Sequence, residues 1–528
     1  MFSRQNAPKF ILGIGVAVYT SVLTYVTWVQ YVDLRDPTFD MGVSLQIVQT
    51  ILRTGLPYET ANWVSSGGTQ SLSFFGIHFS LVRYLFAGAY WIYPRAETLL
   101  FVQALFVSLG SIPAYKLSRF VLNDRRTSLI VSGLYLLIPP IIMSNLYDVH
   151  EEAFVPFALL SAYYFYMTKQ YNKSIGSFVF MGLIQESVDV LIFFMALQLI
   201  AFNFTDYRQF LRDHKLKKRI GITLSLLIAA PLAFILENRL FIAINPAAGF
   251  IPLAPQAYAI SPLNILVNVP QKVVYWLVLL ALTGFLPLLN KRALILVIPW
   301  FFVSVFGGNP NFSVFYNQYS FLIIPPLIIG VIYGIKELRQ RPTSISGPAF
   351  KLRLTPLSKR VPILLLVVYL LFTPFYPLFS PYLVPAPHLA QNYTTPTNST
   401  SIEQLFRMIP SNATILASDD IFAHVVDGIN CYPLLRVNNS TTGQIENTFH
   451  LPTNFTPDYI VIFPADFNNT VKTINGFPSS YELLRDVVGE YSLLTGFNSF
   501  QTQKFEVLLY QYRYVGAASP VTHSINSG

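Results

Sequence analysis

Runs of about 20 apolar residues recur along most of this chain, and they constrain its fold more than any other feature. The 528 residues are 53% hydrophobic and 12% charged, whereas a soluble domain carries about 25% charged residues. A backbone inside a bilayer must satisfy its hydrogen bonds internally, which favours a helix for each run. The sequence therefore predicts an α-helical polytopic membrane protein.

Eleven spans are predicted. The first, 10–32, follows Arg4 and Lys9 and is too long for a signal-peptide core, so we expect a retained anchor helix. The others are expected at 98–118, 127–146, 152–168, 174–186, 188–204, 220–241, 272–289, 293–307, 319–335 and 361–380. Two shorter apolar segments, 41–52 and 77–93, lie inside the first external loop, 33–97, and are typical of helices at the membrane surface.

The basic residues predict the orientation of the chain in the cell membrane. Most of the 35 Lys and Arg residues, including clusters at 208–219 and 336–360, fall in alternate loops. The cytoplasmic excess of Lys and Arg places these loops and the N-terminus inside the cell. The net charge of +9 is then a topology signal and does not indicate nucleic acid as a partner. An odd number of spans puts the C-terminal tail outside.

The tail carries N-x-S/T sequons, which are used only on the external face. They predict glycosylation at Asn392, Asn398, Asn412, Asn438, Asn439, Asn454 and Asn468. Short strands are predicted at 413–418, 459–463 and 505–512, and helices at 401–409 and 481–488. We therefore expect a small extracellular α/β domain, 401–528, joined by a linker, 385–400, to a transmembrane domain, 1–384. The single cysteine, Cys431, excludes an internal disulfide framework and a Cys-based metal site.

Four polar groups are expected on the outer side, where ionisable residues at membrane depth suggest a functional site. The groups are Asp33, Asp36, Asp40 and His78; Asp148, His150, Glu151 and Glu152; Glu186 and Asp189; and Tyr316, Asn317, Gln318 and Tyr319. Together they predict an outward-facing cavity. Each group also has a structural alternative: Asp40 as a helix N-cap, 148–152 as a solvated loop, and Glu186 in a structural ion pair. No H-E-x-x-H spacing, P-loop or nucleophile elbow is present.

Several of these segments resemble a family of predicted membrane proteins of unknown function found in archaea and some bacteria. They are FDMGVSLQIVQ (39–49), HFS (78–80), LLFVQALFVSLGSIPAYKLSR (99–119), LYDVHEEAFVPFALLSAYY (146–164), QE (185–186), YNQYSFLIIPPL (316–327), IPSNATILASDDIFAHV (409–425) and DYIVIF (458–463). That family in turn resembles the GT-C glycosyltransferases, which include protein mannosyltransferases and aminoarabinose transferases. The resemblance implies a GT-C-like fold, a polyprenyl-phosphate sugar donor and a loop acid, matched here by Asp40.

A glycosyltransferase mechanism follows from this resemblance. Asp40 would accept a proton from the acceptor hydroxyl, and we expect His78, Arg83, Gln318 and Tyr319 to contact the substrate. The departing phosphate would be stabilised by His78, by Arg83, or by a divalent metal ion, Mg²⁺ or Mn²⁺, held by Asp148, His150 and Glu186. The acceptor would be a protein or glycan outside the cell.

Two other functions remain open at this point. A non-catalytic scaffold subunit of an envelope complex is favoured by Met41, which stands where those transferases carry a second acid. A transporter or flippase for a lipid-linked sugar would also need a polar cavity, but the internal repeats typical of transporters are not found in the sequence.

Overall fold

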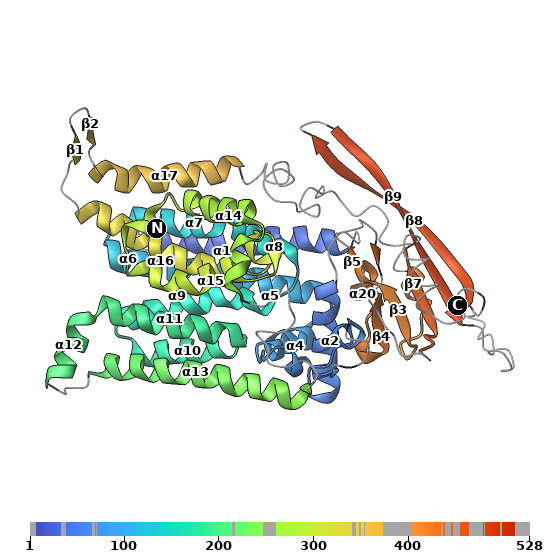
Figure 1. Cartoon of the computed structure of the whole chain (residues 1–528). Coiled ribbons are helices and arrows are strands. Elements are labelled where there is room, and N and C mark those ends of the chain that lie inside the picture. Colours follow the sequence, from blue (N-terminus) through green and yellow to red (C-terminus); the bar gives the residue numbers. More distant parts are fainter. Residues whose placement is uncertain are drawn as a thin grey trace.

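The computed structural model describes residues 7–32, 39–65, 69, 71–213, 217–246, 260–340, 345–347, 350–352, 354–372, 404–434, 437–438, 445–446, 455–463, 479, 481–496 and 499–512. A body of roughly parallel and antiparallel helices is followed by a smaller region built on a β-sheet, and α2 lies across the end of the helical body that faces this sheet (Figure 1). The predicted fold class, a polytopic helical body followed by a small α/β region, is confirmed.

The helical body contains all the α-helices up to α17. They are α1 (Ala7–Val32), α2 (Phe39–Thr54), α3 (Ala61–Ser65), α4 (Arg83–Ile92), α5 (Ala96–Leu109), α6 (Ser111–Leu122), α7 (Arg125–Leu137), α8 (Pro139–Tyr147), α9 (Val155–Met167), α10 (Tyr171–Gly182), α11 (Glu186–Phe202), α12 (Phe204–Asp213), α13 (Lys218–Ile244), α14 (Val269–Leu282), α15 (Ile298–Phe306), α16 (Ser320–Gln340) and α17 (Leu354–Phe372). Every predicted span overlaps one or more of these helices, and residues 373–380 of the last span lie outside the described residues.

Membrane-spanning length is reached by five helical stretches of the described chain. These are Ala7–Val32, Ala96–Leu122, Arg125–Tyr147, Lys218–Ile244 and Ser320–Gln340. A sixth is the pair α11 and α12 if it counts as one span, although the pair is bent by 79°. The expected spans at 152–168, 272–289 and 293–307 form shorter helices, because turns interrupt them. One example follows α14, where Phe285 takes a left-handed backbone conformation with a φ of 54°.

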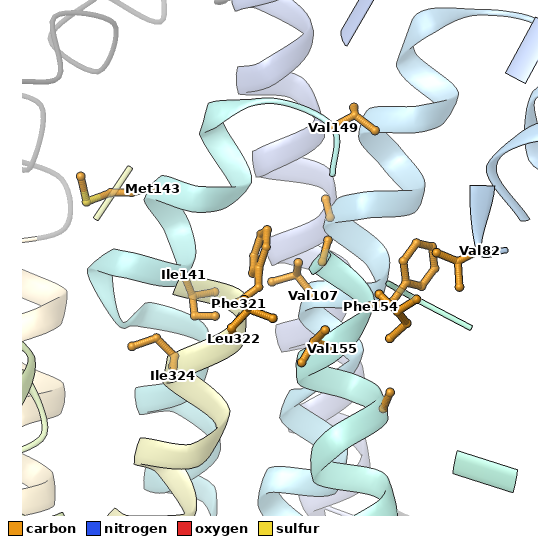
Figure 2. Close-up of a cluster of buried hydrophobic side chains, with 14 of the residues drawn as sticks. Val82, Val107, Ile141, Met143, Val149, Phe154, Val155, Phe321, Leu322 and Ile324 are labelled. Carbon is orange, nitrogen blue, oxygen red and sulfur yellow. The ribbon is translucent and has the colours of Figure 1, made fainter. Parts of the chain in front are cut away.

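Helix α16 lies at the centre of the body. In its most apolar stretch of 18 residues, 89% of the residues are buried. Figure 2 shows Phe321, Leu322 and Ile324 of this helix beside Ile141 of α8. On the other side of the same core, the rings of Phe154 and Phe86 pack edge-on, with 5.2 Å between their centroids. Packing of this kind fixes the ends of α8, α9 and α4, and the polar residues of the candidate site follow directly from those ends.

The break between α10 and α11 joins the loop 33–97 to the body. The carbonyl of Leu183 accepts hydrogen bonds from the backbone N–H groups of Leu81 and Val82, at 2.9 and 3.1 Å. The chain segment just before α4 is therefore held against the first residue of α11, which is Glu186. This contact brings His78 and Glu186 together although 108 positions separate them.

The second region, which we call the C-terminal sheet region, comprises the described residues from 404 to 512. Its five-stranded sheet has the order β4-β3-β7-β9-β8, with β3 parallel to β4 and β7 and with β9 antiparallel to β7 and β8. The elements are β3 (Ile415–Ser418), α20 (Asp419–Val425), β4 (Cys431–Leu434), β7 (Tyr459–Ile462), β8 (Tyr481–Gly496) and β9 (Ser499–Tyr512). Two small ribbons, β1 (Ile345–Gly347) with β2 (Phe350–Leu352) and β5 (Val437–Asn438) with β6 (Ile445–Glu446), lie outside this sheet.

The three strands predicted in the tail are confirmed by β3, β7 and β9. The predicted helix at 481–488 is wrong, because this segment is the first half of β8. Apolar and polar residues in YELLRDVV fit both periods, and β9 supplies a partner strand along the whole of β8, from Tyr481 opposite Tyr512 to Gly496 opposite Ser499. The predicted helix at 401–409 has one described turn, at 404–406.

Some sequence-based predictions fall outside the described residues. They are Asp33, Asp36, the linker 385–400, and the sequons at Asn392, Asn398, Asn439, Asn454 and Asn468. Of the other two sequons, Asn412 is exposed in a turn and Asn438 lies in β5.

Candidate functional site

Asp40 lies in the first turn of α2, which begins at Phe39. It is therefore inside the helix and is not its N-cap. Its side chain is 35% exposed, and its Oδ2 atom is 3.6 Å from Nε2 of His150. The side chain of Tyr147, the last residue of α8, lies close to the same carboxyl group. The structure thus brings together residues of the first and second predicted polar groups.

Asp148 supports the start of α2. Its two carboxylate oxygens accept hydrogen bonds from the backbone N–H groups of Met41 and Val149, each at 2.8 Å. An anion at this place interacts favourably with the free N–H groups and the dipole of the helix N-terminus. Asp148 is 1% exposed, so that its carboxylate positions the Asp40 helix and does not reach a substrate.

Gln103 of α5 ties this arrangement to the helical body. Its Nε2 donates to the carbonyl of Asp148 at 2.6 Å, and its Oε1 accepts from the backbone N–H of His150 at 2.8 Å. Sequence reasoning missed Gln103, although a buried amide inside an apolar span is itself a signal of a specific partner.

Arg83 and Glu151 form an ion pair, with side chains only 5% and 4% exposed. Arg83 also donates to Oγ of Ser44 at 2.7 Å and lies over the ring of Phe74, 5.1 Å from its centroid. The guanidinium is thus engaged by α2, η1 (Phe74–Gly76) and η2 (Glu151–Phe154). Arg83, which the sequence placed at the substrate, holds these elements together.

Replacing Arg83 with Met is expected to destabilise the protein by about 3–5 kcal/mol, because it leaves the carboxylate of Glu151 buried without its partner. Thermal unfolding of the purified protein in one detergent measures the loss. The double variant Arg83→Met/Glu151→Gln removes both charges and should recover much of the stability. Equal melting temperatures for the single and double variants would contradict the pairing.

His78 and Glu186 form the other ion pair of the site. Nδ1 of His78 is 2.8 Å from Oε1 of Glu186, and the backbone N–H of Phe79 donates to Oε2 at 3.1 Å. The side chain of Gln185 lies 3.0 Å from the same imidazole nitrogen. The His78 side chain is 37% exposed, whereas that of Glu186 is 9% exposed. Glu186 therefore lies behind a histidine that remains accessible.

We call the seven residues just described the Asp40 cluster. It consists of Asp40, His78, Arg83, Asp148, His150, Glu151 and Glu186. Only Asp40 and His78 among them keep about a third of the side chain exposed, while the other five are buried. The cluster thus presents one carboxylate and one imidazole, each backed by buried polar groups.

Partial burial and neighbouring charges set the protonation of Asp40 and His78. Burial raises the pKa of Asp40 to about 6, against the opposing effect of the Arg83 charge. Burial alone would lower the pKa of His78, but the charge of Glu186 and the hydrogen bond to it outweigh this effect and raise that pKa to about 9. Between these values Asp40 is an anion and His78 a cation. Burial lowers the pKa of His150 to about 3, so that this ring is neutral beside Asp40.

The fourth predicted group approaches the cluster from the turn before α16. The ring of Tyr316 is 6.0 Å from that of Tyr147, which contacts Asp40. Tyr319 packs instead against Trp300 and Phe312, at 5.4 and 5.1 Å between ring centroids. Gln318 is half-buried in the turn just before α16. The group is therefore adjacent to the site through Tyr316.

The predicted metal ligands Asp148, His150 and Glu186 do not fit a metal ion. Both oxygens of Asp148 and both of Glu186 already accept hydrogen bonds. Within the described part of the chain, no three His, Cys, Asp or Glu residues are arranged to hold a metal. We therefore derive no chemistry from Mg²⁺ or Mn²⁺.

Two further features were not predicted. The carboxyl groups of Asp189 of α11 and Glu237 of α13 lie close together, and no basic side chain forms an ion pair with either of them among the described residues. A groove of about 390 Å³ lies between α1 and α5, away from the Asp40 cluster. It is lined by Ser21, Thr24, Tyr25, Trp28, Glu97 and Phe101.

Comparison with known proteins places the chain in a family. A crystal structure of ArnT from Cupriavidus metallidurans bound to undecaprenyl phosphate is similar to this chain with a TM-score of 0.47 and 12% identity, covering 93% of this chain and 97% of that one. The apo structure of that protein gives a TM-score of 0.43 and 12% identity, with 94% and 98% covered. No curated protein matches the sequence. The family model described as "Predicted membrane protein (DUF2079)" matches residues 30–484. The resemblance inferred from the sequence is thereby confirmed, and the chain belongs to this family of predicted membrane proteins.

Proposed function

We propose that this protein is a membrane glycosyltransferase that moves a sugar from a polyprenyl-phosphate carrier to a hydroxyl group of an acceptor. The observation that carries the proposal is the pair of exposed groups in the Asp40 cluster. A carboxylate and a protonated imidazole are the base and the cation that such a transfer needs. The donor class rests on the sequence resemblance to GT-C enzymes and on the position of the site at one end of the helical body (Figure 1).

In the proposed reaction, the acceptor oxygen attacks the anomeric carbon of the donor sugar. The bond between that carbon and the phosphate oxygen breaks, and the polyprenyl phosphate leaves with the electron pair. Asp40 takes the proton of the acceptor hydroxyl. Its pKa of about 6 keeps the carboxylate ionised at neutral pH and more basic than an ordinary aspartate.

His78 has a separate task in this reaction. As a cation it faces the charge that grows on the phosphate oxygen while the bond breaks. Glu186 keeps the imidazole protonated and fixes its ring through Nδ1. Arg83 is a weaker candidate for the phosphate, because Glu151 and Ser44 already occupy its guanidinium.

The direct test is a transfer assay with purified protein in lipid nanodiscs. A panel of polyprenyl-phosphate sugars is incubated with the protein and with peptide or glycan acceptors, and mass spectrometry detects a sugar added to the acceptor. The proposal expects transfer with at least one donor and release of polyprenyl phosphate in equal amount. Lack of transfer across the panel, with donor binding retained, would favour the scaffold alternative.

The scaffold alternative has one structural observation in its favour. Met41, next to Asp40, is fully buried, so that a second acid is not available at that position. A scaffold would depend on its partner surface and not on the Asp40 carboxylate. If deletion of the gene causes a phenotype, the Asp40→Asn protein can be tested for its ability to restore the wild-type phenotype. Restoration would support the scaffold alternative over the transferase.

We also propose that the N-terminus is cytoplasmic and that the C-terminal sheet region is extracellular and glycosylated. The start of α1 and helix α12, in which the basic cluster 208–219 begins, lie on the side of the body away from the sheet (Figure 1), which agrees with the positive-inside rule. Protease added to intact cells is expected to cleave beyond residue 385. Asn412→Gln should lower the apparent mass, because exposed Asn412 would lose its glycan. Full protection of the tail would reverse the orientation and place the site in the cytoplasm.

A further inference from the structure

The face of α2 that turns away from the helical body is bound by the C-terminal sheet region. Nε2 of Gln46 donates to the carbonyls of Gly428 and Cys431, at 2.7 and 3.1 Å. Oε1 of the same amide accepts from the backbone N–H and the hydroxyl of Thr60, at 2.8 and 3.2 Å. Gln46 is fully buried, and its amide makes four hydrogen bonds, the most that such a group can offer.

Further contacts continue along the same face. Oε1 of Gln49 accepts from the backbone N–H of Gly428 at 2.7 Å, and Arg53 forms an ion pair with Asp427. Nearer to Asp40, a Cβ atom added at Gly42 would lie 2.3 Å from Cδ1 of Phe422 in α20. Only glycine therefore permits this approach of α20 to the first turns of α2.

The opposite face of α2 is bound to the membrane body. Met41 donates to Asp148, and Oγ of Ser44 donates to the carbonyl of Val149 at 3.1 Å. In Figure 1, α2 lies between the helical body and α20. The helix that carries Asp40 is thus held from two sides. On the tail side, its partners are more than 370 positions away from it in the sequence.

We propose that the C-terminal sheet region is part of the active site, because it holds α2 where Asp40 is presented, and that Gln46 is the positioning residue of this contact. The catalytic consequence rests on the proposed function. Gln46 is six residues from Asp40, about 9 Å along a helix, so a shift at Gln46 moves the carboxylate with it. Positions that differ by about 1 Å can change a rate by about 100-fold.

The chain contains its own reporter of this contact. Cys431 is the single cysteine, is 1% exposed, and lies in β4, where its carbonyl accepts from Gln46. Burial also raises the pKa of its thiol, which suppresses the reactive thiolate. Alkylation by iodoacetamide under native conditions therefore reports openings that expose β4, the strand whose Cys431 carbonyl is bound by Gln46.

The test compares Gln46→Leu with the wild-type protein in nanodiscs. The apolar side chain leaves the Gly428 carbonyl without its Gln46 donor and the Cys431 carbonyl with only the hydroxyl of Thr60, at 2.6 Å. We therefore expect Cys431 alkylation to become at least about tenfold faster. Hydrogen exchange at the Met41 amide should become faster too, because Gln46 no longer fixes α2 to the C-terminal sheet region. In the transfer assay kcat should fall, and the acid midpoint of the rate near pH 6 should move to lower pH, because Asp40 becomes more hydrated.

The matched control is Gln271→Leu. Nε2 of Gln271 also donates to two carbonyls, those of Pro310 and Ser313, but these lie within the helical body. This variant should leave alkylation, Met41 exchange and the pH midpoint unchanged. Asp40→Asn should lower transfer by about 10²–10⁴-fold and leave Cys431 protected. Because Asp40→Asn is expected to change transfer without changing alkylation, it separates a failure of the proposed function from a failure of the proposed contact between α2 and the C-terminal sheet region.

A second variant covers the case in which Gln46→Leu does not fold. Gly42→Ala forces a methyl group against Phe422 and should also speed alkylation and Met41 exchange, and Gly42→Ala/Phe422→Ala should restore both. The inference is overturned if the folded variants keep wild-type alkylation, or if alkylation rises while Met41 exchange and transfer stay at the wild-type level.

Discussion

Asp40→Asn is expected to lower the rate of sugar transfer by about 10²–10⁴-fold, which is the usual contribution of a general base. Asn keeps the size of the side chain, but it cannot take a proton at neutral pH. Expression and melting temperature should hold, because Asp148 and not Asp40 binds the free N–H group of Met41. The initial rate of acceptor glycosylation is the measurement.

Two other substitutions show whether the loss belongs to this carboxylate. Asp40→Ala should lower the rate as much as Asp40→Asn, with only a small effect on stability. Asp36→Asn, a change at a neighbouring aspartate, should keep the rate close to normal. Full transfer by Asp40→Asn together with loss of transfer in Asp36→Asn would show that the base is the other aspartate. If neither change matters in an assay that detects transfer, the first loop is structural.

Glu186→Gln is expected to move the alkaline limb of the pH profile. Transfer should be fastest between the pKa of Asp40, about 6, and that of His78, about 9. The sign follows from the roles: the rate falls below the lower value as Asp40 takes a proton, and above the higher value as His78 loses one. Removing the Glu186 charge leaves burial, which lowers the pKa of His78, so the alkaline midpoint should fall by about 1–3 pH units.

The effect of Glu186→Gln on the rate is largest at a pH at which His78 of the wild-type protein is still protonated. At pH 8.5 a shift of two units lowers the protonated fraction of His78 by more than about tenfold, and the rate should follow. His78→Arg keeps the positive charge up to a pH above 12 and should remove the alkaline limb if the geometry is tolerated. An unchanged alkaline midpoint in Glu186→Gln, with transfer otherwise intact, would exclude His78 as the group that titrates.

Much of the helical body could be predicted from local sequence. Each predicted span coincides with helix, because an apolar run in a bilayer has few other ways to satisfy its backbone. The parallel strands β3 and β7 were also predictable, since each is a short apolar run that is buried on both faces. The family followed from the motifs around Asp40, His150 and Glu186, and the family match confirms it.

The tertiary structure decided which polar residues are accessible and what holds them. From the sequence, Asp40, Asp148, Glu151 and Glu186 are equivalent carboxylates on one side of the membrane. Their roles differ because of partners far along the chain: Asp148 binds the N–H of Met41, Glu151 pairs with Arg83, and Glu186 pairs with His78. Residue spacing carries no information about such pairs, since they form only when distant helices pack.

The same reason explains what the sequence could not predict about α2 and β8. Periodicity indicates that one face of α2 is apolar and buried, but it does not say that the polar Gln46 is buried too, against carbonyls from β4. The segment 481–488 suits a helix by itself and becomes a strand because β9 lies beside it. Local sequence determined where the chain forms helices in the membrane, whereas contacts between distant segments decided which carboxylate is presented and what holds it in place.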